Sequence, residues 1–190
     1  TYQVVVTDTN QCVDSLSVFI DQPFAPIALS ATQVDILCFG DATGEVDLTV
    51  SGGTPASTGY VFDWNTCAFA TEDLVDIPFG PYAVLVTDSL LCSDTLSVTL
   101  TQPDAPIDID FTILNVSCFG DSTGDVLAAI SGGTVPYTWT WDAPIVDTTL
   151  FIDSLPIGDY VLNVIDSNNC VYQETATVTQ PDAPLTVTYD

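Results

Sequence analysis

Apolar and polar residues alternate along most of the chain, which is the period-two pattern of half-buried β-strands. No stretch keeps the spacing of an amphipathic helix over a useful length. In the C-terminal half the alternation predicts strands separated by the turn-forming clusters GDSTG, SGGTVP, SLPIG and DSNN. The predicted strands are Ile107–Val116, Asp125–Ser131, Tyr137–Trp141, Thr149–Asp153, Tyr160–Asp166 and Thr175–Gln180. Such short, regularly spaced strands predict an all-β fold, an antiparallel β-sandwich with Greek-key links.

The same pattern occurs more than once. Tyr2, Tyr82 and Tyr160 each begin a strand of similar sequence, with a cysteine 10 residues later and Gln-Pro 10 residues after that. This regularity predicts tandem repeats of about 80 residues. Their expected bounds are residues 1–23 (C-terminal part of one repeat), 24–103 and 104–181 (two complete repeats), and 182–190 (start of another). Because the chain opens in mid-strand pattern, we expect it to be part of a longer protein.

Two features favour repeats of the immunoglobulin/fibronectin type III kind. Trp64 and Trp141 fall in the third strand of their repeats, where such sandwiches place a core tryptophan. Tyr82 and Tyr160 follow a turn containing Pro and Gly, as in a tyrosine corner. These four side chains are therefore predicted to lie in the core.

The charged residues exclude several classes of partner and of catalytic site. The chain has 26 acidic residues and no Lys, Arg or His, for a formal charge of −26. A surface without cations disfavours nucleic acids and anionic membranes as partners, and no apolar run is long enough for membrane insertion. Without His or Lys, the common nucleophilic and Schiff-base sites cannot be built, so we expect no enzyme.

Six cysteines without a CxxC motif or a histidine predict disulfides in an extracellular setting rather than a zinc site. The simplest pairing closes each repeat: Cys38 with Cys92, and Cys118 with Cys170. Cys12 would then pair upstream of residue 1. A sandwich of this kind places the paired positions at opposite ends, so bridges between neighbouring repeats remain an alternative. Cys67 has no counterpart in the other repeat and is expected to be unpaired or buried.

Acidic residues in turns are candidates for a calcium site, although no cofactor is expected to be required. Calcium takes several oxygen ligands. The candidates are Asp41, Glu45, Asp121 and Asp125, in and after the Gly-Asp-x-Thr-Gly turns, with Asp88 and Asp166 at the ends of the tyrosine strands. The alternative is that these aspartates cap turns by accepting backbone N–H bonds.

Three aromatic residues alternate with threonines and so share one face of a strand: Tyr137, Trp139 and Trp141. They form either the inner face of the sandwich or a platform for a sugar. The exposure of Trp139 distinguishes the two, because a buried ring cannot bind a ligand.

The ordered set of motifs resembles the SprB-type repeat. The set is Cys-Phe-Gly-Asp-x-Thr-Gly, Ser-Gly-Gly-Thr, Pro-Tyr-x-Trp-x-Trp, Gly-x-Tyr, Val-x-Asp-Ser-Asn-Asn-Cys and Thr-Gln-Pro. It covers both complete repeats and the leading fragment, and the first repeat departs from it at Pro55–Gly59. The resemblance implies a very long cell-surface adhesin of Bacteroidota, exported by type IX secretion and in some species moved along the cell for gliding.

The resemblance also implies a modification. Bacteroidota O-glycosylate Asp-Ser and Asp-Thr pairs followed by a small or apolar residue. The matching hydroxyl residues are Ser15, Ser89, Thr95, Ser122, Thr148 and Ser154.

The leading interpretation is a structural stalk of a giant secreted adhesin on the bacterial outer surface, with neighbouring repeats of the same chain as its partners. One alternative is a carbohydrate- or ligand-binding module that recognises surface glycans. Another is a self-assembling extracellular filament, in which residues 1–7 or 182–190 complete the sheet of another copy.

Overall fold

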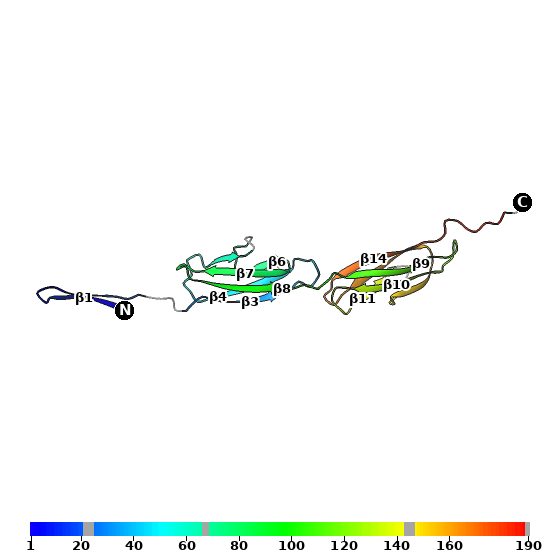
Figure 1. Cartoon of the computed structure of the whole chain (residues 1–190). Coiled ribbons are helices and arrows are strands. Elements are labelled where there is room, and N and C mark those ends of the chain that lie inside the picture. The colour runs from blue at the N-terminus through cyan, green and yellow to red at the C-terminus, as the bar shows by residue number, and fades with distance from the viewer. Residues whose placement is uncertain (21–24, 66–68, 143–146, 189–190) are drawn as a thin grey trace. The chain divides into compact units, whose positions relative to one another are not determined.

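The computed structural model describes residues 1–20, 25–65, 69–142 and 147–188. The described part contains strands and no helix, as predicted (Figure 1). Its residues form two compact units. The first comprises Thr1–Gln33, Val46–Leu74 and Pro81–Val98; the second comprises Val34–Glu45, Val75–Gly80 and Thr99–Asp190. The repeat boundaries predicted from the sequence remain predictions, and the Gln22-Pro23 boundary lies outside the described residues.

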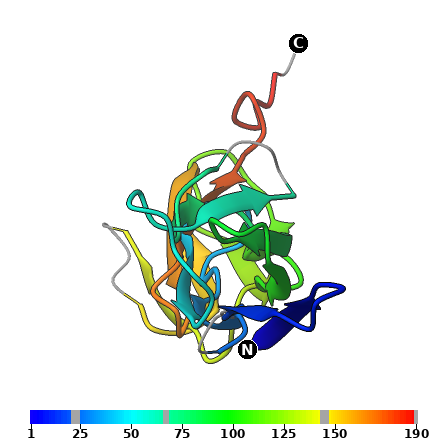
Figure 2. The same cartoon turned by 90° about the vertical axis from the view of Figure 1, so that its left-hand side faces the viewer.

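The chain begins with a β-hairpin. β1 (Tyr2–Thr7) pairs antiparallel with β2 (Val13–Val18), drawn in blue in Figures 1 and 2. Every residue of both strands is exposed, although the strands contain apolar side chains such as Val4, Val6 and Leu16. At the other end, the described residues after Val178 form no strand (Figure 2).

Six strands follow the hairpin. They are β3 (Ala28–Val34), β4 (Gly44–Ser51), β5 (Val61–Trp64), β6 (Leu74–Ile77), β7 (Gly80–Thr87) and β8 (Ser93–Leu100). They form two three-stranded sheets, of order β3-β4-β6 and β5-β7-β8.

The next six strands repeat this arrangement. They are β9 (Asp108–Leu114), β10 (Gly124–Ser131), β11 (Thr138–Trp141), β12 (Phe151–Leu155), β13 (Gly158–Ile165) and β14 (Val171–Val178). Their sheets have the order β12-β10-β9 and β11-β13-β14, with antiparallel pairing. All six strands predicted in this half are present; the last begins at Val171, earlier than the predicted Thr175. The immunoglobulin/fibronectin-like sandwich predicted from the sequence is confirmed.

The core of this sandwich draws on both sheets. Val126 of β10 and Ile152 of β12 belong to the same buried cluster as Leu162 of β13 and Val178 of β14. Alternate residues of each strand point into this cluster, which is why the period-two pattern could be read from the sequence. Full burial of one such side chain contributes about 1.5–3 kcal/mol.

The four side chains predicted for the core are all buried. Trp64 is 1% exposed and Trp141 is 3% exposed. The phenol of Tyr160 donates to the Pro156 carbonyl at 2.9 Å, which is the bond of a tyrosine corner. Burial raises the pKa of both Tyr82 and Tyr160. None of the described residues belongs to a helix long and apolar enough to cross a membrane.

Candidate functional site

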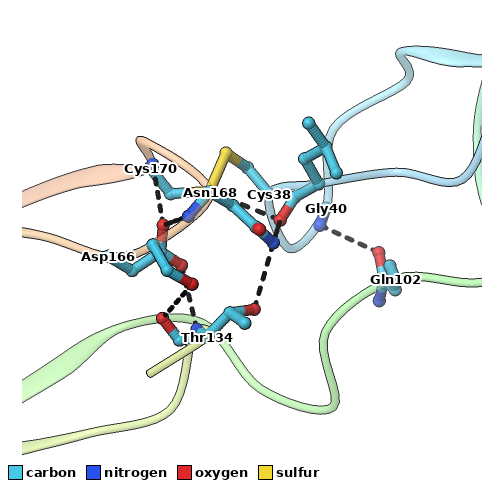
Figure 3. The surroundings of a disulfide bond; sticks show 9 residues. Cys38, Gly40, Gln102, Thr134, Asp166, Asn168 and Cys170 are labelled. Carbon is cyan, nitrogen blue, oxygen red and sulfur yellow. Dashed lines mark hydrogen bonds between the residues drawn. A yellow bond between two sulfur atoms is a disulfide. The ribbon is translucent and has the colours of Figure 1, made fainter. Parts of the chain in front are cut away.

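The site with the most specific chemistry is a disulfide between two turns of the second compact unit. Cys38 is bonded to Cys170, with a Cα–Cα distance of 5.6 Å and a sequence separation of 132 residues. In the chain-entropy model a bridge that closes so long a loop stabilises the folded state by up to about 5 kcal/mol. Figure 3 shows the residues that hold the two turns.

The first of these turns, Cys38–Asp41, is named the CFGD turn. Its Asp41 N–H donates to the Cys38 carbonyl at 3.2 Å. Gly40 has φ of +82°, a left-handed conformation that favours glycine. The Gly40 N–H donates to the side-chain oxygen of Gln102 at 3.0 Å (Figure 3). The glutamine of the Gln-Pro motif therefore fixes the CFGD turn, a role that the sequence analysis missed.

The second turn, Asp166–Cys170, is named the aspartate turn and is organised by one buried carboxylate. Oδ1 of Asp166 accepts the N–H groups of Asn168 at 2.8 Å and Cys170 at 2.9 Å, and Oδ2 accepts the Thr134 N–H at 2.9 Å. Figure 3 shows the Asp166 side chain pointing at these donors. The carboxylate thus sets the direction in which the cysteine is presented.

Asp88 organises an equivalent turn, Asp88–Cys92. Its carboxylate accepts N–H groups from Thr54, Leu90 and Cys92, each at 2.9 Å. These bonds, the one from Thr54 foremost, lower the pKa of Asp88 although burial opposes them. The turn-capping alternative of the sequence analysis therefore describes what Asp88 does in this structure.

The pairing of cysteines within one repeat, predicted first, is wrong for this structure. The Val116 N–H donates to the Thr179 carbonyl at 2.9 Å, which places Cys118 beyond the end of β14, whereas Cys170 immediately precedes its start. An eight-residue strand spans roughly 26 Å, and a disulfide needs Cα atoms within about 7 Å.

Strand β8 separates Cys38 from Cys92 in the same way. The Ile36 N–H donates to the Thr101 carbonyl at 2.9 Å, so the CFGD turn lies at the end of β8 and Cys92 lies before its start. The structure instead contains the alternative left open by the sequence, a bridge between cysteines of neighbouring sequence repeats.

Asn168 adds a polar contact to the bridge. Its side-chain amide donates to the Leu37 carbonyl at 2.9 Å and to the Thr134 hydroxyl at 3.1 Å (Figure 3). The corresponding residue of the turn Asp88–Cys92 is Leu90, which has no such side chain, whereas that of the turn Asp8–Cys12 is Asn10. Because these partners are far apart in sequence, no local pattern could have identified the contact.

The other described cysteines are free thiols. Cys12, Cys92 and Cys118 are all exposed. Cys67, expected to be unpaired or buried, lies outside the described residues.

A cavity of about 320 Å³ lies beside the bridge, lined by Cys38, Asp41, Ile107, Asp166 and Tyr172 among others. Both oxygens of Asp166 are already occupied by backbone N–H groups. Asp41 supplies the other carboxylate. The lining also includes the side chains of Asn169 and of Tyr172, whose hydroxyl donates to Glu174 at 3.0 Å. With Asp166 and Tyr172 already engaged, we assign no ligand to this cavity.

The predicted calcium ligands are not gathered into one group. Asp41, Glu45 and Asp121 are exposed, Asp125 is half-buried, and the carboxylates of Asp88 and Asp166 hold turns. Across the described ranges, no three or more acidic or cysteine side chains are placed to hold a metal ion. Calcium binding remains a prediction without a located site.

The three aromatic residues do not form an exposed platform. Trp141 is buried, while Tyr137 and Trp139 pack against the core at its edge. The indole N–H of Trp139 donates to the Thr148 carbonyl at 3.0 Å, and the Tyr137 hydroxyl donates to the Gly132 carbonyl. Trp139 is only half-buried, but its polar atom is already engaged.

All the predicted glycosylation positions are exposed: Ser15, Ser89, Thr95, Ser122, Thr148 and Ser154. The Ser89 hydroxyl donates to the Thr54 carbonyl at 2.7 Å, so it would have to give up this bond. Glycosylation remains a prediction.

A comparison with known protein families finds one repeat family in this chain. The model of the SprB repeat matches residues 30–69 and 111–144, one segment in each predicted complete repeat. Two segments of this chain match the SprB repeat. The resemblance noted in the sequence is thereby confirmed, and an adhesin-type repeat module of an extracellular or cell-surface protein is supported. No curated protein matches the chain.

Two solved structures are similar in fold class. The N-terminal eight immunoglobulin domains of Down syndrome cell adhesion molecule are 12% identical, with 82% of this chain and 25% of that chain covered at a TM-score of 0.43. Cadherin domains 1–4 of protocadherin gamma B7 are 10% identical, with 93% and 64% covered at a TM-score of 0.39. This chain thus spans less than two thirds of either.

Proposed function

We propose that this chain is a load-bearing segment of the stalk of a secreted cell-surface adhesin. The observation that carries the proposal is the bond between Cys38 and Cys170. When the chain is pulled at its two ends, tension enters at Cys38 and leaves at Cys170 through the disulfide. The residues between them, which include strands β4 to β13, are then relieved of extension, whereas β3 and β14 lie outside the span and stay under tension.

The surface charge fits a stalk that stays separate from its neighbours. With a formal charge of −26 and no Lys, Arg or His, no side-chain ion pair can join two copies of this chain. Like-charged copies repel one another over a Debye length of about 8 Å at physiological salt. This repulsion disfavours bundling of many copies at a cell surface.

The side chains around the bridge do not support a catalytic function. Repeats of adhesion proteins are typically non-enzymatic, and the cavity beside the bridge contains no nucleophile–base pair. We propose a mechanical role without a catalytic residue.

The stalk role is tested by exchange in the producing cell. Residues 24–181 are replaced in the whole adhesin by unrelated sandwich repeats of equal length, and cell attachment is measured. A stalk predicts attachment close to the unmodified level, with antibodies against the exchanged segment labelling intact cells. Loss of attachment despite normal surface labelling would show that this segment itself binds the target.

One observation favours self-assembly as a second candidate function. The hairpin β1–β2 exposes apolar side chains, with Val4 at 58%, Val6 at 63% and Leu16 at 65%. In the repeat assignment this face is the one that the other strands of the hairpin's own repeat would cover. In a filament, strands of a second copy take their place and extend the edges of the hairpin. Sedimentation over a wide concentration range tests it: the candidate predicts association that disappears in Val4→Ser/Val6→Ser, and a monomer at every concentration would rule it out.

A further inference from the structure

The turn at Cys118 has the geometry of the bridged CFGD turn at Cys38. The Asp121 N–H donates to the Cys118 carbonyl at 3.1 Å, and the Gly120 N–H donates to the Gln180 side chain at 2.9 Å. The corresponding bonds of the bridged turn have nearly the same lengths. Cys118 is nevertheless an exposed free thiol. The turn is built for a bond that it does not make within this chain.

The turns at Cys12 and Cys92 likewise have the geometry of the bridged aspartate turn at Cys170. In each, an aspartate four residues earlier accepts the cysteine N–H at 2.9 Å. Both cysteines are exposed free thiols. The chain therefore contains two kinds of turn, and within each kind the backbone hydrogen bond at the cysteine is the same in every copy.

The two CFGD-type turns differ in the exposure of the apolar residue that lies beside each of them. A cavity of about 430 Å³ next to Cys118 is lined by Pro181, Pro184 and Leu185 among others. In the repeat alignment Leu185 corresponds to Ile107, which is 7% exposed and lies beside the cavity at the bridge. Leu185 is 96% exposed. The position that Ile107 holds in a sandwich core is thus matched beside Cys118 by an apolar side chain that the described residues leave exposed.

We propose that the CFGD-turn cysteine of each repeat bonds to the aspartate-turn cysteine of the repeat that follows. Cys118 is then one half of a bridge whose partner is a following SprB repeat, and Cys92 is one half of a bridge to a preceding repeat. Cys38 and Cys170 are the one pair of these turns related in this way within residues 1–190, and they are the pair that is bonded. A longer array is thereby joined covalently across every repeat.

Each bridge forms by thiol–disulfide exchange with a low-molecular-weight disulfide such as oxidised glutathione. The thiolate of one cysteine attacks a glutathione sulfur and releases one glutathione thiol. The thiolate of the second cysteine then attacks the mixed disulfide and releases the other. The two protein thiols lose two protons and two electrons, and the electrons remain on the two glutathione molecules.

The test extends the whole chain by one repeat. Residues 1–181 are followed directly by a second copy of residues 104–190 that carries Ser117→Thr and Val171→Ile at exposed positions, so that its two cysteine peptides differ in mass from those of the first copy. The protein is refolded with reduced and oxidised glutathione. Trypsin does not cleave a chain without Lys or Arg, so the protein is digested at acidic residues. Linked peptides are identified by mass before and after reduction.

The expected result is two linked pairs: Cys38 with the first Cys170, and Cys118 with the added copy of Cys170. Cys118→Ser should remove the second pair only, and Cys92→Ser should leave both unchanged. The first pair reports folding within the same molecule. The proposal is overturned if the first pair forms while Cys118 stays a free thiol, if Cys118 bonds to the first Cys170, or if neither pair forms. The inference rests on the proposed array, but the masses are read without any adhesion assay, so the two can fail separately.

Discussion

The Cys170 N–H donates to the Asp166 carboxylate at 2.9 Å, so the bridged cysteine is presented by an acid that is itself 4% exposed. The same carboxylate reaches across to the Thr134 N–H. A side chain that a charge count would assign to the surface instead fixes the turn at which the chain is crosslinked. Backbone N–H groups are the partners of this carboxylate, in a chain that has no Lys, Arg or His to pair with it.

Replacing this carboxylate should weaken the turn. Asp166→Ala leaves the N–H groups of Thr134, Asn168 and Cys170 without their acceptor, and each unsatisfied, partly buried group costs about 1–3 kcal/mol. We expect a clear drop in the free energy of unfolding measured in urea, and a smaller yield of the Cys38–Cys170 bridge on refolding. Asp104→Ala, at an exposed position, should change neither. Equal effects of the two substitutions would contradict the role given to Asp166.

The lowered pKa of Asp88 makes its contribution depend on pH. Because the folded pKa lies below the ordinary value of 3.8, the stabilisation is fully present above that value and is lost as pH falls through the folded pKa. Thermal melts of the unmodified chain and of Asp88→Asn should therefore differ most near pH 6 and converge toward pH 2. A difference that stays constant over this range would show that the carboxylate charge does not contribute.

Two glycines with similar backbone angles should respond differently to alanine. A Cβ at Gly132 (φ +69°) would lie 1.7 Å from the Pro106 carbonyl oxygen, whereas a Cβ at Gly120 (φ +82°) would meet nothing within 4 Å. Gly120→Ala should cost about 1–2 kcal/mol for the left-handed conformation alone. Gly132→Ala should cost more, because backbone must also move, and urea unfolding of the two variants compares them. Similar costs would contradict the close approach at Pro106.

The aromatic strand offers a matched pair of tryptophans. Trp141→Ala leaves a cavity at a buried site and should lower the free energy of unfolding by about 3–5 kcal/mol. Trp139→Ala should cost less, because its ring lies at the edge of the core. Urea unfolding followed by circular dichroism measures both, because the backbone signal does not depend on the tryptophan that was removed. A larger loss of unfolding free energy for Trp139→Ala than for Trp141→Ala would contradict the position of the core in the structure.

The sequence predicted the strands because each has a wet face and a buried face, as in the alternation of Tyr160, Leu162 and Val164. For the cysteines it put closure of each repeat first, although a sandwich already places those positions at opposite ends. The strand β14, which separates Cys118 from Cys170, is that obstacle, and the bridge between neighbouring repeats is the alternative that the sequence left open. The contacts of Gln102 and Asn168 could not be predicted, since each joins residues more than 60 positions apart. Alternation reports which face is buried; it carries no information on which distant turns meet.

The most direct test of the load path is to pull the chain by its two ends in a single-molecule force experiment, with and without reductant. A Cys38–Cys170 bridge predicts that the fully extended oxidised chain is shorter than the reduced one by roughly 430–480 Å. Cys38→Ser should have the reduced length in either condition, and Cys92→Ser should behave like the unmodified chain. Equal extended lengths with and without reductant would contradict the account. So would an oxidised chain that is shorter by roughly 180–190 Å for each bridge, which is the difference that bridges within single repeats would give.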